Sequence, residues 1–138
     1  MKNEIILKEG FGELRFGMQI NQVINLIGNP SEVEEIGEDL EMPATVLYYE
    51  EKGLSLFFEN LDQEKLSCIN IETEDILLFG KQIFGKTSKE IVELMRENKI
   101  FEQTMDKEEW GEERISYEEY AIDFFFLDDK LNSVTLGL

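Results

Sequence analysis

The feature that most constrains this chain is an internal repeat. Phe16 and Gly17 recur as Phe84 and Gly85, 68 residues later, and the same offset aligns the chain without a gap as far as Phe58. The other identical pairs are Leu26 with Leu94, Glu34 with Glu102, Glu41 with Glu109, Tyr49-Glu50-Glu51 with Tyr117-Glu118-Glu119, and Phe57-Phe58 with Phe125-Phe126. Further on, an offset of 65 matches Ile69 with Val134. A fixed period of this size indicates one structural unit used twice.

Chance matching in a chain rich in Glu and Phe is the alternative, but the matched segments also carry matching local patterns. Ile20, Val23, Ile24 and Ile27 form one apolar stripe at helical spacing, and Gly28-Asn29-Pro30 is typical of a helix end. In the second unit, Thr87 and Glu90 form a capping box ahead of an apolar segment at 91–95. A short helix is therefore predicted at the same place in each unit.

Strand patterns follow each predicted helix. We expect first strands at 31–37 and 100–105, hairpins of 45–50 with 54–59 and of 113–119 with 122–127, and closing strands at 66–72 and 131–137. Residues 5–7 and 76–79 are expected to be edge strands or entry segments. The predicted fold class is α+β, a tandem duplication of a helix packed on a three- to four-stranded antiparallel sheet. Residues 1–72 form the first expected repeat and 73–138 the second, together one compact domain.

Alternation along the strands sorts side chains between two faces of each sheet. Leu54, Leu56 and Phe58, with their counterparts Ile122, Phe124 and Phe126, are expected beneath the helices. The opposite face is expected to carry Tyr48, Glu50, Ser55, Phe57, Leu66, Cys68 and Asn70 in the first repeat, and Ser116, Glu118, Asp123, Phe125, Leu131, Ser133 and Thr135 in the second.

An aromatic residue on the outward face of both repeats predicts a contact surface. We expect Phe57, Phe125, Tyr48 and Trp110 to be anchors for a protein partner, and Glu50, Glu118 and Asp123 to steer and align it. Two alternatives remain: Phe57 and Phe125 are covered within the molecule, by each other or by the other repeat, or they are covered by a second copy in a homodimer.

The charge of the chain limits its partners. With 31 Asp and Glu against 13 Lys and Arg, the net charge is −18. Such a surface repels nucleic acid and anionic membranes, so neither is an expected partner, and a protein partner is expected to be basic. The chain has no histidine, one cysteine and no phosphate-binding glycine motif, so no catalytic residue, cofactor or metal is predicted.

The segment 16–30, Phe-Gly-Met-Gln-Ile-Asn-Gln-Val-Ile-Asn-Leu-Ile-Gly-Asn-Pro, precedes a Tyr-rich strand at 47–50 and a glycine hairpin into 54–58. This pattern resembles the outer-membrane assembly lipoproteins of the SmpA/OmlA (BamE) type. In tandem it resembles the β-lactamase inhibitor protein architecture, and that resemblance implies two helix-plus-sheet repeats whose sheets form a concave, aromatic-rich surface that grips a protein.

The sequence therefore favours a non-catalytic protein-binding module, in the form of an immunity-type protein or another stoichiometric inhibitor of a basic partner. An intracellular structural or assembly protein that forms a homodimer through the same face is the alternative, and a small-molecule-binding protein is the third. A single cysteine and the lack of a long apolar run near the start favour a reducing compartment, and we expect the cytoplasm.

Overall fold

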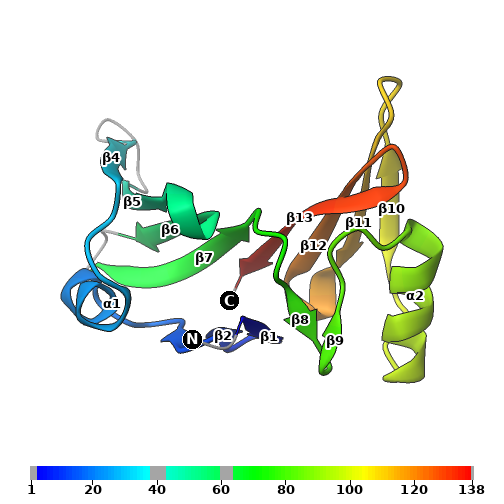
Figure 1. Cartoon of the computed structure of the whole chain (residues 1–138), viewed down its shortest axis with the longest axis horizontal. Helices are drawn as coiled ribbons and strands as arrows, with labels where there is room; N and C mark the ends of the chain where they lie inside the picture. Colours follow the sequence, from blue (N-terminus) through cyan, green and yellow to red (C-terminus); the bar gives the residue numbers. More distant parts are fainter. Residues whose placement is uncertain (1–2, 38–42, 60–63, 138) are drawn as a thin grey trace.

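The computed structural model describes residues 3–37, 43–59 and 64–137. Strands dominate this part of the chain, and they form one sheet of eight strands and one of five. Two α-helices lie at opposite ends of the molecule, α1 (Ile20–Ile27) and α2 (Ser88–Glu97) (Figure 1). Buried side chains from both sheets and both helices form one continuous hydrophobic core.

The eight-stranded sheet is antiparallel throughout and takes four strands from each half of the chain. The first half contributes β4 (Glu32–Ile36), β5 (Ala44–Tyr49), β6 (Leu54–Glu59) and β7 (Lys65–Ile71). The second half contributes β10 (Thr104–Lys107), β11 (Glu112–Tyr117), β12 (Ile122–Leu127) and β13 (Lys130–Gly137). The strand order is β10-β11-β12-β13-β7-β6-β5-β4, so the halves meet where β13 pairs with β7. Both wings of the sheet rise from this central pair (Figure 1).

The five-stranded sheet is small and joins the two halves a second time. Its strands are β1 (Glu4–Ile6), β2 (Gly10–Phe11), β3 (Leu14–Arg15), β8 (Leu77–Leu78) and β9 (Lys81–Gln82), in the order β3-β2-β1-β8-β9. The strand β1 connects the hairpin β2–β3 to the hairpin β8–β9, because it pairs antiparallel with β2 and parallel with β8.

The predicted α+β fold, a helix packed on a separate sheet of three or four strands in each half, is wrong. The chain is mostly β, with sheets of eight and five strands and two short helices among the described residues. The physical reason is that β7 and β13 would each leave a row of unpaired backbone groups, which pairing with each other removes. The segments expected only as edges or entries supply two strands of the second sheet, β1 and β8, and its other three strands were not predicted.

The predicted hairpins are present, and their registers repeat. Leu47 lies opposite Leu56 in β5–β6, and Ile115 lies opposite Phe124 in β11–β12. Both β6–β7 and β12–β13 contain a register shift at the same place, between Phe57 and Phe58 and between Phe125 and Phe126. At the centre of the sheet, Asn70 pairs with Thr135, which is its own equivalent at the offset of 65. The sheet thus has an approximate two-fold axis through this pair.

The repeated Phe-Gly marks a shared backbone connection. Gly17 and Gly85 have φ angles of 91° and 79°, a region that favours glycine. Their amides donate to the carbonyl oxygens of Leu66 and Leu131, at 2.9 and 3.1 Å, so each helix entry is tied to the start of β7 or β13.

The first strands depart from the gap-free alignment. Val33 of β4 lies opposite Leu47, whereas Met105 of β10 lies opposite Ile115, so the structural offset here is 72 rather than 68. The identity of Glu34 with Glu102 is therefore coincidental, and the partner of Glu34 in the repeat is Asp106. The identity of Glu41 with Glu109 involves a residue outside the described part of the chain.

Two tyrosines attach the helix-to-strand connections to the core. Tyr49 donates its hydroxyl hydrogen to the carbonyl oxygen of Gly28, at 2.8 Å, just beyond α1. Tyr117, its equivalent, donates to Oε1 of Gln103, also at 2.8 Å, and contacts Phe124 edge-on with ring centroids 5.9 Å apart. Both rings are buried, so their hydroxyl groups need these partners.

Candidate functional site: a concave groove on the eight-stranded sheet

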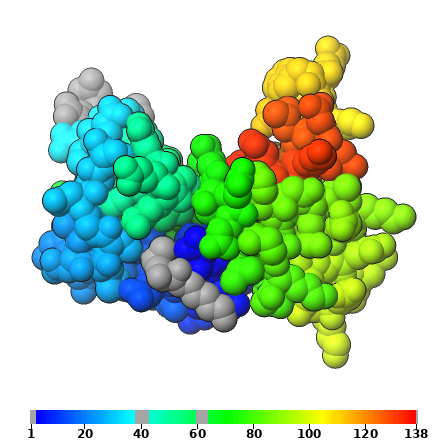
Figure 2. Space-filling model, viewed as in Figure 1, coloured from blue at the N-terminus to red at the C-terminus, as the bar shows by residue number. Residues whose placement is uncertain are grey.

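The wings of the eight-stranded sheet enclose a groove above the β7–β13 pair, which we call the concave groove. The space-filling view shows the hollow between the two wings (Figure 2). Its volume is about 680 Å³, within the usual range for binding sites. It is lined by Tyr48, Ser55, Phe57, Cys68, Asn70, Glu72, Glu112, Phe125, Phe126, Leu127, Asn132, Ser133 and Thr135.

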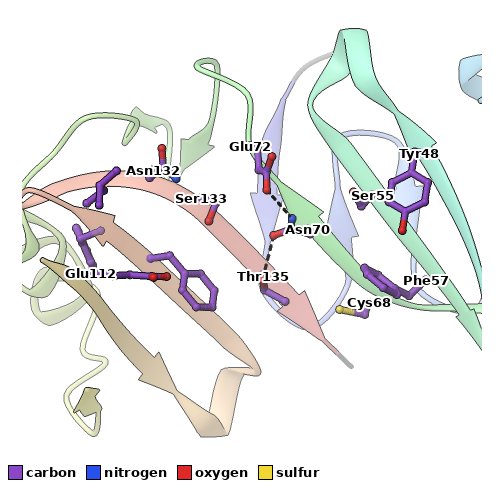
Figure 3. Close-up of a pocket in the computed structure, with 13 residues that line it drawn as sticks. Tyr48, Ser55, Phe57, Cys68, Asn70, Glu72, Glu112, Asn132, Ser133 and Thr135 are labelled. Carbon is purple, nitrogen blue, oxygen red and sulfur yellow. Dashed lines mark hydrogen bonds between the residues drawn. The ribbon is translucent and has the colours of Figure 1, made fainter. Parts of the chain in front are cut away.

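A row of directly opposed residues crosses the whole sheet on this face. From β4 to β10 it runs Glu32, Tyr48, Ser55, Asn70, Thr135, Asp123, Ser116 and Thr104. Asn70 and Thr135 lie at its centre, and the Thr135 hydroxyl donates to Oδ1 of Asn70 at 3.1 Å (Figure 3). Small polar side chains at the centre leave the floor of the groove open.

Phe57 and Phe125 stand diagonally across this floor. Phe57 on β6 is opposite Cys68 of β7, and Phe125 on β12 is opposite Ser133 of β13. Because β7 and β13 are antiparallel, these two rows lie on either side of the central row. Both rings are half-buried and line the groove, so neither is sealed within the hydrophobic core.

The two ends of the groove differ in chemistry. We call the end formed by Phe125, Glu72 and Glu112 the acidic corner, and the end formed by Phe57, Tyr48 and Cys68 the neutral corner. In Figure 3, Tyr48, Ser55 and Phe57 lie on one side of the central pair and Glu112 lies on the other. The lining contains two carboxylates and no Lys or Arg.

Two leucines predicted on this face lie in the core instead. Leu66 and Leu131 are each 1% exposed and belong to the hydrophobic cluster. The register shift beside Phe57 and Phe125 is the cause, because one extra residue on β7 and on β13 reverses the alternation beyond that point. A rule of strict alternation cannot anticipate such a bulge.

Glu50 and Glu118 do not lie at the groove. They begin the short 3-10 helices Glu50–Lys52 and Glu118–Tyr120, where strand alternation no longer applies. Both are exposed, and they line separate shallow hollows. The sequence placed them on the strand face because the predicted strands 45–50 and 113–119 extend one and two residues beyond the observed ends of β5 and β11.

The other predicted site residues lie beside the groove. Asp123 is half-buried in the central row. Trp110, which is 68% exposed, lies in the β10–β11 connection and donates from Nε1 to Oε2 of Glu112 at 3.0 Å. Trp110 shares a second hollow with Phe125 and Glu112, so this exposed surface continues into the acidic corner.

Sequence reasoning missed Glu72 and Glu112. Glu72 follows the last residue of β7, where alternation ends, and Asn70 Nδ2 donates to its Oε1 at 3.2 Å. Glu112 lies one residue before the strand predicted at 113–119, whereas in the structure it begins β11 opposite Leu127. Alternation at period two could have found both, because it places Glu72 on the face of Asn70 and Glu112 on the face of Ser116.

The carboxylates set the electrostatics of this face. Burial raises the pKa of Tyr48, and Glu34 and Glu32 raise it further. Burial also raises the pKa of the Cys68 thiol, with a further contribution from Asp123, so this thiol stays protonated at neutral pH. Arg114 has a raised pKa because it donates a hydrogen bond to Asp106 and forms an ion pair with it. The positive charge of Arg114 is therefore already paired with the carboxylate of Asp106.

Several hydroxyl groups of the groove have no hydrogen-bond partner within residues 3–37, 43–59 and 64–137. The Ser133 side chain is the most enclosed, since the residue is 9% exposed and lines the groove. The hydroxyl groups of Tyr48 and Ser55, on the opposite side of the groove, also have no hydrogen-bond partner among the described residues, and both residues are half-buried. A buried polar group of this kind is stabilised when a ligand or water supplies the missing hydrogen bond.

In the described part of the chain, no group of three or more Cys, Asp or Glu side chains could hold a metal ion. Neither described helix is long and apolar enough to cross a membrane.

Comparisons with known proteins return little for this chain. No family model matches it, and no curated protein matches it significantly. Among solved structures, it is similar to an extracellular protein containing an SCP domain from Bacillus anthracis str. Ames, with a TM-score of 0.49 and 14% sequence identity. The match covers 95% of this chain and 49% of that one, so the chain spans about half the length of this neighbour.

Proposed function

We propose that this chain is a non-catalytic protein-binding module that holds a basic protein partner in the concave groove, as a stoichiometric inhibitor of the immunity type. The observation that carries the proposal is the groove itself. Half-buried aromatic rings stand on its two walls, and among the described residues that line it there are carboxylates and no Lys or Arg.

The aromatic residues are suited to anchor a partner. Phe57, Phe125 and Tyr48 are held by the sheet, so little conformational entropy is lost when a partner covers them. Residues of this kind, surrounded by polar groups that exclude water, commonly dominate the free energy of protein binding. Trp110 extends the surface beyond the groove.

The charge supports a basic partner. A net charge of −18 accelerates the encounter with a positively charged protein and opposes association with acidic ones. Proteins that act on nucleic acid carry positive surfaces that contact phosphates, and an acidic module that covers such a surface blocks the activity. An inhibitor of a nucleic-acid-directed toxin has this chemistry.

Affinity capture from the native host tests the proposal. The immobilised wild-type chain is compared with the double variant Phe57→Ala/Phe125→Ala and with Phe101→Ala, which removes a ring that is 61% exposed outside the groove. We expect a basic protein that wild type and Phe101→Ala retain and the double variant loses, with 1:1 stoichiometry by calorimetry. Affinity is expected to fall at least about 30-fold, as for the loss of one binding hot spot.

Two other results would contradict the proposal. Equal retention by all three chains would show that the groove is not the binding surface. A wild-type dimer in light scattering that Phe57→Ala/Phe125→Ala converts to a monomer would show that a second copy covers the groove. Thermal unfolding of the double variant is the folding control, and we expect a modest loss because both rings are only half-buried.

A further inference from the structure

The acidic and neutral corners are equivalent in the repeat, yet only the acidic corner has carboxylates among the residues that line the groove. The carboxylates beside the neutral corner, Glu32 and Glu34, lie on β4 at the edge of the sheet, next to Tyr48. At the offset of 68, the equivalent of Glu112 is Ala44, and at the offset of 65, the equivalent of Glu72 is Gly137. The neutral corner therefore has no carboxylate at either position. A symmetric scaffold with asymmetric chemistry indicates an occupant whose two ends differ.

Both carboxylates of the acidic corner are oriented by neutral donors. Asn70 Nδ2 donates to one oxygen of Glu72 at 3.2 Å, and Trp110 Nε1 donates to one oxygen of Glu112 at 3.0 Å. Within the described residues, the second oxygen of each carboxylate has no hydrogen-bond or ion-pair partner. Beside the ring of Phe125, the acidic corner thus presents carboxylate oxygens without a partner in the described part of the chain, and the neighbouring cation, Arg114 opposite Phe125, is paired with Asp106 instead.

The neighbouring hydroxyl supports the same conclusion. Ser133 lies opposite Phe125, is 9% exposed, and has no side-chain hydrogen bond within the part of the chain that the structure describes. A guanidinium or ammonium group has several donors, which carboxylates and a hydroxyl oxygen can accept, and it also interacts favourably with an aromatic ring. A cationic side chain satisfies every group at this corner.

The spacing of the corners fits an extended segment. The row of Phe57 meets β7 at Cys68. Val134 pairs with Ile71, so one further step of the register places Ser133, in the row of Phe125, opposite Glu72. Cys68 and Glu72 are four residues apart along β7, about 13 Å, whereas the rings of Phe57 and Phe125 are also three strands apart. A segment that lies over β7 therefore reaches both corners with side chains four residues apart, which point to the same side.

We propose that the concave groove recognises an extended segment of its partner through one cationic side chain, arginine or lysine, at the acidic corner and an apolar side chain four residues away at the neutral corner. This inference rests on the proposed function, because it specifies which part of the basic partner enters the groove.

The test uses the full chain and a defined peptide. The probe is an N-acetylated, C-amidated pentapeptide of sequence Leu-Thr-Ser-Thr-Arg, titrated into the isotopically labelled protein and followed by the amide NMR signals of β6, β7, β12 and β13. In the matched peptide, citrulline replaces arginine, which removes the charge and keeps the shape. Free arginine amide is the third ligand.

We expect the arginine peptide to shift the amide signals of the groove. The citrulline peptide is expected to bind at least about fivefold more weakly than the arginine peptide. The affinity of the double variant Glu72→Gln/Glu112→Gln for the arginine peptide is expected to fall by the same factor relative to wild type. Glu50→Gln/Glu118→Gln changes the net charge equally at exposed positions outside the groove and is expected to bind like wild type. Thermal melts check that all variants fold.

Three results would overturn the inference. Equal affinity for the arginine and citrulline peptides would show that the corner does not select a cation. Equal weakening by the two double variants would assign the effect to the overall charge. Binding of free arginine amide as strong as that of the peptide would indicate a small-cation site. The capture experiment with Phe57→Ala/Phe125→Ala does not depend on these charges, so the proposed function can survive each of these results.

Discussion

Gly53 and Ala121 occupy the same position in the two halves and share the same left-handed backbone conformation, with φ angles of 64° and 49°. A Cβ added at Gly53 would lie 2.8 Å from the backbone nitrogen of Thr73. The second half tolerates an alanine here, and the first half has no room for one.

Exchanging these two residues should therefore have unequal effects. We expect Gly53→Ala to lower the free energy of unfolding by about 2 kcal/mol or more, because left-handed strain and the contact with Thr73 add. Ala121→Gly relieves strain and loses backbone rigidity, so its effect is expected to stay within about 1 kcal/mol. Urea denaturation measures both, and equal effects would contradict the structural difference.

The register shift in β6–β7 predicts a sharp contrast between two residues on one strand. Leu66 is buried in the core, whereas Cys68 lines the concave groove. We expect Leu66→Ala to cost about 2–5 kcal/mol of stability, as for other buried leucines, and Cys68→Ala to cost about 1 kcal/mol or less. Leu131→Ala is the matched variant in the second half. Similar stabilities of Leu66→Ala and Cys68→Ala would mean that the bulge is absent.

Alkaline titration tests the environment of Tyr117. Burial raises its pKa to about 12, so between pH 10 and pH 12 the unfolded chain releases a proton that the folded chain keeps. The contribution to stability is complete below pH 10 and is lost as the pH rises towards 12, about 2–3 kcal/mol in total. We expect Tyr117→Phe to reduce this alkaline loss relative to wild type in urea unfolding at pH 9 and pH 11.5. An unchanged slope would contradict the assignment.

The single cysteine reports on the groove. Because burial and Asp123 raise the pKa of Cys68, we expect iodoacetamide to alkylate it at least about tenfold more slowly at pH 8 than it alkylates the unfolded chain. Asp123→Asn should speed the reaction slightly, and a partner in the groove should slow it further. Alkylation at the rate of the unfolded chain would show that neither burial nor Asp123 protects this thiol.

The sequence alone predicts the parts of this structure that depend on local pattern. The alternation of Leu54, Leu56 and Phe58 correctly assigns a buried face, because three residues at period two require one. Thr87 and Glu90 form the predicted capping box, with Thr87 N donating to Glu90 Oε1 at 3.1 Å and Glu90 N donating to Thr87 Oγ1 at 3.2 Å.

The rest depends on contacts between distant segments. Nothing local to β7 or β13 shows that their edges pair, and this pairing both merges the sheets and creates the concave groove. No residue pattern marks the bulges beside Phe57 and Phe125, so alternation assigns Leu66 and Leu131 to the wrong face. Tyr48, Phe57 and Phe125 could be proposed from pattern, whereas the approach of Glu72 to Phe125 across β13 depends on the pairing of β7 with β13.

The pairing of Asn70 with Thr135 also has a meaning for the origin of the chain. When equivalent residues face each other, the same surface occurs on both sides of the contact, as in the isologous interface of a two-fold symmetric dimer. An ancestral peptide of half this length could build the same sheet by meeting an identical molecule. Once two such genes are joined end to end, the two halves can acquire different residues. A groove whose two ends differ in chemistry then becomes possible.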